Sequence, residues 1–181
     1  MLSDEQRLAL VELARVSVLA RVTGTVAPFA QPLDFPRASG VFVTLKRAGE
    51  LRGCLGTLAC KLALGDEVIR CAADSATRDP RFSPVTVGEL ADLAYEVSVL
   101  GPLEPLEPVD ATAITIGVHG LVVEQGRRRG VLLPQVAAER SWSAEQFLHH
   151  TCVKAQLPSD AWQRGATVYI FVADVFGDGH R

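Results

Sequence analysis

The sequence predicts an α+β fold in which a mainly antiparallel sheet is flanked by helices. An apolar, β-branched segment at 40–46 is followed by turn-forming residues and by a partner strand at 51–55, as in an antiparallel hairpin. A second pair of such segments, 120–124 and 130–133, surrounds a basic turn. Helical and strand patterns alternate irregularly, not as repeated strand–helix–strand units, which disfavours a doubly wound parallel sheet.

Length and composition support a folded chain. The protein has 181 residues, of which 48% are hydrophobic and 22% charged, and these proportions exclude disorder over the whole chain. A chain of this length buries roughly 70% of the surface that its unfolded form exposes, so it needs no metal or disulfide to hold its fold. We therefore expect a single domain over residues 1–181.

Capping residues and apolar periodicity place the other elements. Ser3 followed by Gln6 has the spacing of a capping box and predicts a helix that runs to about Val22, before a loop at 23–39. Segment 62–77 has one apolar face, which predicts a second helix. The remaining expected elements are a short helix at 85–90, a strand at 93–100, a helix from Ser143 to near Ala155 and a strand at 167–175.

Charge and cysteine content bound the compartment and the partners. The net charge is −3, which argues against general adhesion to nucleic acid or membranes. Acidic residues before Leu8 argue against a signal peptide, and the longest charge-free apolar-leaning stretch, 111–123, is too short to cross a bilayer. No CxxC pair is present, so we expect free thiols in a soluble, cytoplasmic protein.

The segment around Cys54 is the main candidate for chemistry. On a strand, Arg52 and Cys54 would share one face, and a guanidinium beside a thiol favours the nucleophilic thiolate. Gly53 and Gly56 leave room for a ligand or another backbone to approach the sulfur. The alternative interpretation is that Cys54 is a small buried hydrophobe and that the glycines allow tight packing.

A second candidate segment lies at the end of the helix at 62–77. Arg78 and Arg81 surround Asp79, and paired guanidinium donors can bind the carboxylate or phosphate of a small anionic ligand. The alternative is that Asp79 pairs with one of the arginines and fixes the loop. Both interpretations remain open at the level of sequence.

Other polar residues give weaker signals. His119 before a glycine could be a general base near neutral pH, although a lone histidine is more often structural. Gln135 follows a buried strand and can donate and accept hydrogen bonds. The arginines at 127–129 form a solvated hairpin tip or, alternatively, a phosphate contact. His149 and His150 are adjacent on a helix and do not share a face, so we expect no metal site, and no cofactor motif is present.

Four segments together resemble the AMMECR1 family, and in particular its bacterial members in the AmmeMemoRadiSam system. They are GVFVTLKRAGELRGCLGTL at 40–58, RDPRFSPVTVGELADLAYEVSVLGPLEPL at 78–106, GVHGLVVEQGRRRGVLLPQVA at 117–137, and the stretch 142–162. The resemblance implies a two-lobed α+β fold with a cleft, and it makes the Arg-Gly-Cys segment the candidate functional site. The system's name implies association with a Memo-like protein and a radical SAM protein. This implication rests on the company of the protein and not on the chemistry of its residues.

Three hypotheses about function follow. In the first, the protein is an enzyme or a subunit of a modification pathway, in which Cys54 is the nucleophile, Arg52 lowers the pKa of its thiol, and His119 moves protons. Gly53, Gly56, Arg78, Asp79, Arg81 and Gln135 would then contribute to substrate binding. In the second, the protein is a non-catalytic adaptor for the two partners. In the third, the arginines at 127–129, together with Arg52 and Arg81, bind RNA or another phosphate-bearing ligand, and the net negative charge of the protein counts against this.

Overall fold

The structure is a computed structural model that describes residues 2–26 and 34–178, so part of the loop expected at 23–39 lies outside the described residues. The chain divides into two compact units, one formed by residues 1–100 and 174–181 and the other by residues 101–173. Helices combined with antiparallel strand pairing confirm the α+β prediction.

Unit 1 begins with α1 (Asp4–Thr23), which is capped as the sequence predicts. The Ser3 hydroxyl accepts a bond from the Gln6 N–H, and the Gln6 side chain accepts one from the Ser3 N–H, which completes the capping box. Gly24 ends the helix in the left-handed region, with φ of 73°. The start and the end of this helix are therefore both encoded locally.

The hairpin and the second helix of unit 1 also match their predicted positions. Strand β1 (Gly40–Arg47) pairs antiparallel with β2 (Glu50–Thr57), and α2 (Leu64–Thr77) follows. The short 3-10 helix η1 (Val87–Asp92) leads into β3 (Leu93–Leu100), which pairs with the other side of β1.

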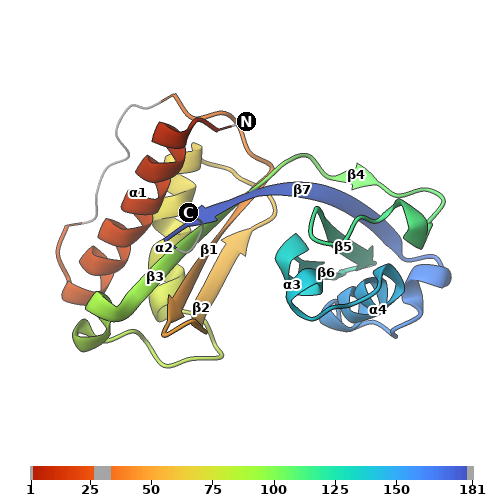
Figure 1. Ribbon diagram of the computed structural model, residues 1–181. Helices are drawn as coiled ribbons and strands as arrows, with labels where there is room; N and C mark the ends of the chain where they lie inside the picture. Colours follow the sequence, from red (N-terminus) through yellow and green to blue (C-terminus); the bar gives the residue numbers. More distant parts are fainter. Residues whose placement is uncertain (1, 27–33, 179–181) are drawn as a thin grey trace. The chain divides into compact units, whose positions relative to one another are not determined.

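The three strands of unit 1 run in the order β2-β1-β3, and α1 and α2 pack against one face of them (Figure 1). Alternate residues of β1 and β3 point into this interface and form the core with the helices. These strand residues are Val41, Val43, Leu45, Tyr95, Val97 and Val99. Because side chains alternate across a strand, the residues between them occupy the other face.

Unit 2 contains short strands and helices around a second core. Its elements are β4 (Glu104–Pro105), the 3-10 helix η2 (Ala111–Ala113), β5 (His119–Gln125), β6 (Arg128–Leu132), α3 (Pro134–Glu139), α4 (Ala144–Lys154) and the 3-10 helix η3 (Ala161–Gln163). Strand β7 (Thr167–Gly177) begins in unit 2, where it pairs with β5, and its last residues belong to unit 1. Helix α3 was not predicted, because its six residues are too few to show a helical period.

The core of unit 2 is centred on α4. Phe147, Leu148 and Cys152 are fully buried there, against Leu121 and Val123 of β5. The Ser143 capping box predicted from the sequence is present. Within the described residues, no helix has both the length and the apolar character that a membrane crossing requires.

Candidate functional site: the polar face of the unit 1 sheet

The Arg-Gly-Cys segment lies on β2, the edge strand of unit 1. The backbone groups of Cys54 are bound by side chains that follow α2. Its N–H donates to Asp79 Oδ2 at 2.8 Å, and its carbonyl accepts from an Arg81 Nη2 donor at 3.2 Å. These bonds cap backbone groups that would otherwise be free to pair with another chain.

Arg52 does not activate Cys54. The register between β1 and β2 shifts at this point, so that Leu45 pairs with Gly53 and Lys46 with Leu51, and Arg52 is left in a β-bulge. Its guanidinium binds both carboxylate oxygens of Glu89, at 2.8 and 3.1 Å, and donates to the carbonyl of Ser83. The prediction that Arg52 lowers the pKa of Cys54 is therefore wrong, since the bulge redirects the side chain and the carboxylate neutralises its charge.

Gly53 and Gly56 serve close packing within unit 1. A Cβ atom on Gly53 would overlap the carbonyl oxygen of Ser75 in α2, and one on Gly56 would overlap the Val41 carbonyl and the Phe42 ring. The sequence left open whether a ligand or another part of the chain approaches these glycines. In the structure, atoms of the protein's own chain lie where a Cβ atom would be. The structure thus gives both glycines a packing role.

Arg81 and Asp79 bind each other. Asp79 is buried and accepts from Arg81 Nε at 2.9 Å and from Arg81 Nη2 at 2.7 Å. The hydrogen bond from Arg81 lowers the pKa of Asp79 to about 2, so the carboxylate is charged at neutral pH. Arg78 is exposed and pairs with Asp74 at 3.3 Å. Asp79 therefore occupies the position that an anionic ligand would need between the two arginines.

A set of polar residues shares with the Cys54 thiol the face opposite the helices, which we call the polar face. Thr44 pairs with Cys54 on one side and with Glu96 on the other, so all three side chains lie on this face. The Thr44 hydroxyl donates to the Cys54 sulfur at 3.3 Å, and Lys46 Nζ donates to Glu96 Oε2 at 3.1 Å. Ser98 completes the set, because it pairs with Phe42 two positions along β1.

Three members of the polar face are buried, although polar side chains are normally solvated. The relative exposure is 6% for Thr44, 7% for Glu96 and 0% for Ser98. Ser98 Oγ has no hydrogen-bond partner among the described residues. Sequence reasoning missed Thr44, Lys46, Glu96 and Ser98. The alternation in 93–100 signalled a polar side to β3, but it could not show that this side is buried and lies beside Cys54.

Burial raises the pKa of the Cys54 thiol above its ordinary value. The hydrogen bond from Thr44 and the positive charge of Arg81 lower it in part, whereas the charges of Asp79 and Glu96 raise it. Cys54 is therefore held as the neutral thiol at neutral pH in this structure. Because the thiolate is the nucleophilic form, the site must remove this proton before the sulfur can react.

The other cysteines lie in packed surroundings. Cys71 and Cys152 are buried in the cores of unit 1 and unit 2, and Cys60 is half-buried beside the first core. Burial raises the pKa of Cys71 to about 12 and also raises the pKa of Cys60 and Cys152. Cys54 differs from them in having a hydroxyl, an ammonium and a carboxylate on its face of the sheet.

The remaining predicted residues belong to unit 2. His119 begins β5, and its Nδ1 accepts the Thr115 N–H at 3.1 Å, which closes a turn. Gln135 lies in the first turn of α3. In the basic hairpin, Arg128 donates to the Gln156 carbonyl at 2.9 Å, and Arg129 pairs with Glu124 at 3.4 Å.

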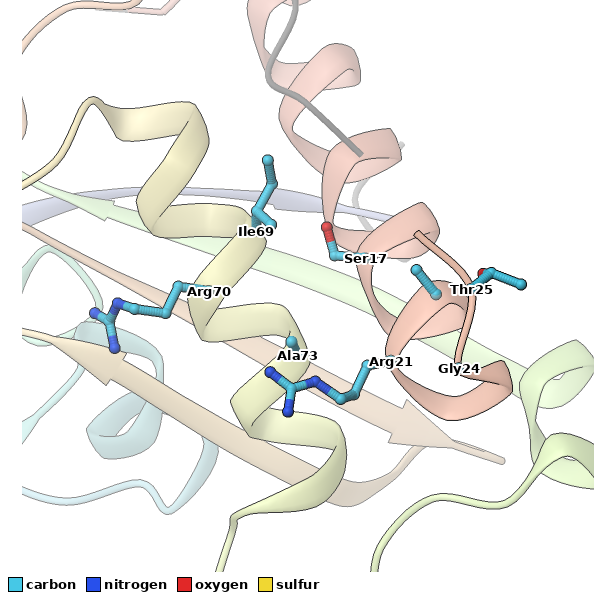
Figure 2. Close-up of a pocket in the computed structure, with 8 residues that line it drawn as sticks. Ser17, Arg21, Gly24, Thr25, Ile69, Arg70 and Ala73 are labelled. Carbon is cyan, nitrogen blue, oxygen red and sulfur yellow. The ribbon is translucent and has the colours of Figure 1, made fainter. Parts of the chain in front are cut away.

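Two cavities in unit 1 are lined by residues other than those of the polar face. One, of about 270 Å³, lies between α1 and α2, and Figure 2 shows Arg21 of α1 and Arg70 of α2 among the residues that line it. The other, of about 580 Å³, is lined by residues 35–38 and 60–64. Neither lining includes Cys54. Within residues 2–26 and 34–178, no group of three or more His, Cys, Asp or Glu side chains is arranged to hold a metal ion.

Known proteins are similar to this chain in sequence and in fold. The AMMECR1 family model matches residues 11–176. A protein from Methanothermobacter thermautotrophicus is 46% identical over 183 residues, which cover 97% of this chain and 95% of that protein. One from Methanosarcina barkeri is 40% identical over 97% of this chain and 92% of its own length.

The crystal structure of the uncharacterized protein PH0010 from Pyrococcus horikoshii has the same fold. It superimposes with a TM-score of 0.90 at 39% identity, over 99% of this chain and 94% of that one. The match in sequence and the match in structure each extend over nearly the whole chain, and the Arg-Gly-Cys segment and the polar face lie within the matched region. The chain belongs to the AMMECR1 family.

Proposed function

We propose that this AMMECR1-family protein is a thiol-dependent component of a modification pathway, in which Cys54 reacts covalently with the substrate. The observation that carries this proposal is the position of the thiol on a buried polar face. Stability alone favours apolar side chains on a buried strand face, and departures from that pattern concentrate at functional sites. Ser98 Oγ adds a buried hydrogen-bonding group that a substrate could satisfy.

The neighbouring residues of the motif stabilise the fold through their side chains or their close packing, whereas the Cys54 side chain has no such role. Arg52, Asp79 and Arg81 tie the loop after α2 to β2, and Gly53 admits the backbone of α2. By contrast, the Cys54 side chain contacts the hydroxyl of Thr44, which favours the thiolate once it forms. The resting thiol is protonated, so we place activation at the moment of substrate binding.

The proposed partners are a Memo-like protein and a radical SAM protein, as the family resemblance implies. If Cys54 carries the chemistry, its loss should abolish the pathway's product without releasing the partners. This separates a reacting subunit from a non-catalytic adaptor, for which the thiol would be dispensable.

The test compares Cys54→Ser with Cys60→Ser in the organism that encodes the protein, after deletion of the native gene. Mass spectrometry of proteins and small molecules should give the deletion pattern for Cys54→Ser and the wild-type pattern for Cys60→Ser. Tagged wild-type and Cys54→Ser proteins should co-purify the same partners. A Cys54→Ser strain with the wild-type pattern would overturn the proposal, as would the absence of any difference between the deletion and the wild type.

A further inference from the structure

We infer that Glu96 is the general base that takes the proton of the Cys54 thiol, and that Lys46 positions its carboxylate. The inference deepens the proposed function and rests on the proposed role of Cys54. The proton leaves Sγ and bonds to a carboxylate oxygen of Glu96, while the electron pair of the S–H bond stays on sulfur. No oxidant or further reactant is required for this step.

Strand register places the base. Cys54 and Glu96 flank Thr44 on the same face, each opposite it on a neighbouring strand. Directly paired residues in antiparallel strands lie about 5 Å apart, so a glutamate side chain can extend over the space between β3 and the thiol. The negative charge of Glu96 also raises the pKa of the Cys54 thiol, although by less than burial does.

The remaining contacts fit the two roles. Lys46 Nζ holds Glu96 Oε2 at 3.1 Å, which fixes the direction of a carboxylate that has only 7% exposure. The Thr44 hydroxyl donates to sulfur at 3.3 Å, so it can stabilise the thiolate without moving. Lys46 on β1 thus fixes the Glu96 carboxylate. Thr44 on the same strand donates a hydrogen bond to the sulfur as its negative charge develops.

Charge conservation explains why a buried base suits this site. Creating a thiolate alone would add an uncompensated charge to a half-buried position between buried neighbours, which is costly. Transfer from Cys54 to Glu96 leaves the total charge of these groups unchanged, because the negative charge moves from the carboxylate to the sulfur. The other charged groups that act on the thiol, Asp79 and Arg81, neutralise each other at 2.7 Å.

The test is the pH profile of Cys54 alkylation by iodoacetamide from pH 4 to pH 11, followed on the Cys54 peptide by mass spectrometry. In the wild type we expect two rises, one as a carboxyl group ionises in the acid range and one as the thiol itself ionises. Between them the rate should be level, because the form with the proton on Glu96 is a constant fraction there.

Glu96→Gln should remove the lower rise and reduce the rate at pH 7 at least tenfold. An increase in the alkylation rate at pH 7 would instead indicate a carboxylate that acts only through its charge. In that case its removal lowers the pKa of the thiol, and the rate at pH 7 increases. Glu50→Gln, at an exposed residue at the start of β2, is the matched control and should keep the wild-type profile.

Two further measurements separate this result from misfolding. Lys46→Met with Glu96→Gln removes both charges of the buried pair and should also lose the lower rise. Alkylation of Cys71 and Cys152, which are buried in the two cores, reports unfolding in each variant. A single rise in the wild type, or a faster reaction of Glu96→Gln at pH 7, would overturn the role of Glu96. The proposed function would stand or fall separately, on Cys54→Ser in cells.

Discussion

At the scale of single residues, the motif around Cys54 separates into side chains that hold the fold and one that is available for chemistry. Gly53 has a backbone role, since α2 passes beside its Cα. Cys54 presents its backbone to Asp79 and Arg81 and its side chain to the polar face. One short segment therefore joins the packing of α2 to the position of the thiol.

Gly53→Ala should lower the free energy of unfolding by roughly 1–3 kcal/mol, the usual cost of an added group in a close-packed site. The added methyl group would meet the Ser75 carbonyl, which belongs to helical backbone and cannot rotate away. Urea unfolding measures the change. Gly88→Ala in η1 is the control, because nothing lies within 4 Å of its new Cβ and the effect should be small. Equal losses in the two variants would contradict the packing role of Gly53.

At the scale of elements, the β-bulge at Arg52 decides what β2 presents on each face. Period-two alternation alone puts Arg52 beside Cys54, but the register shift between Leu45 and Lys46 breaks that alternation. Arg52 instead joins β2 to the loop before η1 through Glu89 and Ser83. The bulge thus turns a predicted activator into a clamp between two elements.

Arg52→Met, which removes the charge but keeps most of the side-chain length, should leave the midpoint of the upper rise in Cys54 alkylation, where the thiol ionises, unchanged. It should also lower the free energy of unfolding by roughly 1–3 kcal/mol, since the Glu89 carboxylate loses its two shorter charged hydrogen bonds. Amide hydrogen exchange should quicken at residues 83–89. A marked rise in the alkylation midpoint would instead restore the hypothesis that Arg52 activates the thiol.

Arg47→Met is the matched control for this clamp. Arg47 also pairs with Glu89, at 3.4 Å, and with Asp92, but its side chain is 45% exposed compared with 14% for Arg52. Exposed ion pairs contribute little, so we expect a loss below about 1 kcal/mol and normal exchange at residues 83–89.

At the scale of the whole molecule, acid stability should depend on buried and hydrogen-bonded carboxylates. Hydrogen bonds from Arg81 and Arg52 hold the pKa of Asp79 and of Glu89 at about 2 in the folded protein. In the unfolded chain these groups ionise near 4. Because the folded pKa is lowered, their contribution to stability is present above about pH 4 and is lost as the pH falls toward 2.

Asp79→Asn should flatten this acid dependence. The wild type should lose about 2 kcal/mol more stability than the variant between pH 4.5 and pH 2, because a shift of nearly two units in one carboxyl pKa is worth about 2.5 kcal/mol and about half of the Asp79 groups are still ionised at pH 2. Urea unfolding at a series of pH values measures the slope. Asp66→Asn, at an exposed residue of α2, should keep the wild-type slope. Parallel curves for wild type and Asp79→Asn would show that Asp79 contributes nothing.

The sequence by itself determined the features that rest on local chemistry. The capping boxes at Ser3 and Ser143, the hairpin of β1 and β2, and the alternation of β3 are each written within a few residues, and all three kinds of signal led to the correct element. The Arg-Gly-Cys motif likewise drew attention to Cys54. Helix α3 escaped because six residues carry no clear period.

Only the tertiary structure decided which polar residues meet at the thiol. Thr44 lies on β1 and Glu96 on β3, whereas Cys54 lies on β2. Strand register, which is a non-local property, brings the three residues to one face. The structure also bound Arg52 to Glu89 instead of to the thiol. The physical reason is that the faces of a strand follow from local alternation, whereas burial, bulges and the choice of ion-pair partner depend on which distant segments pack together.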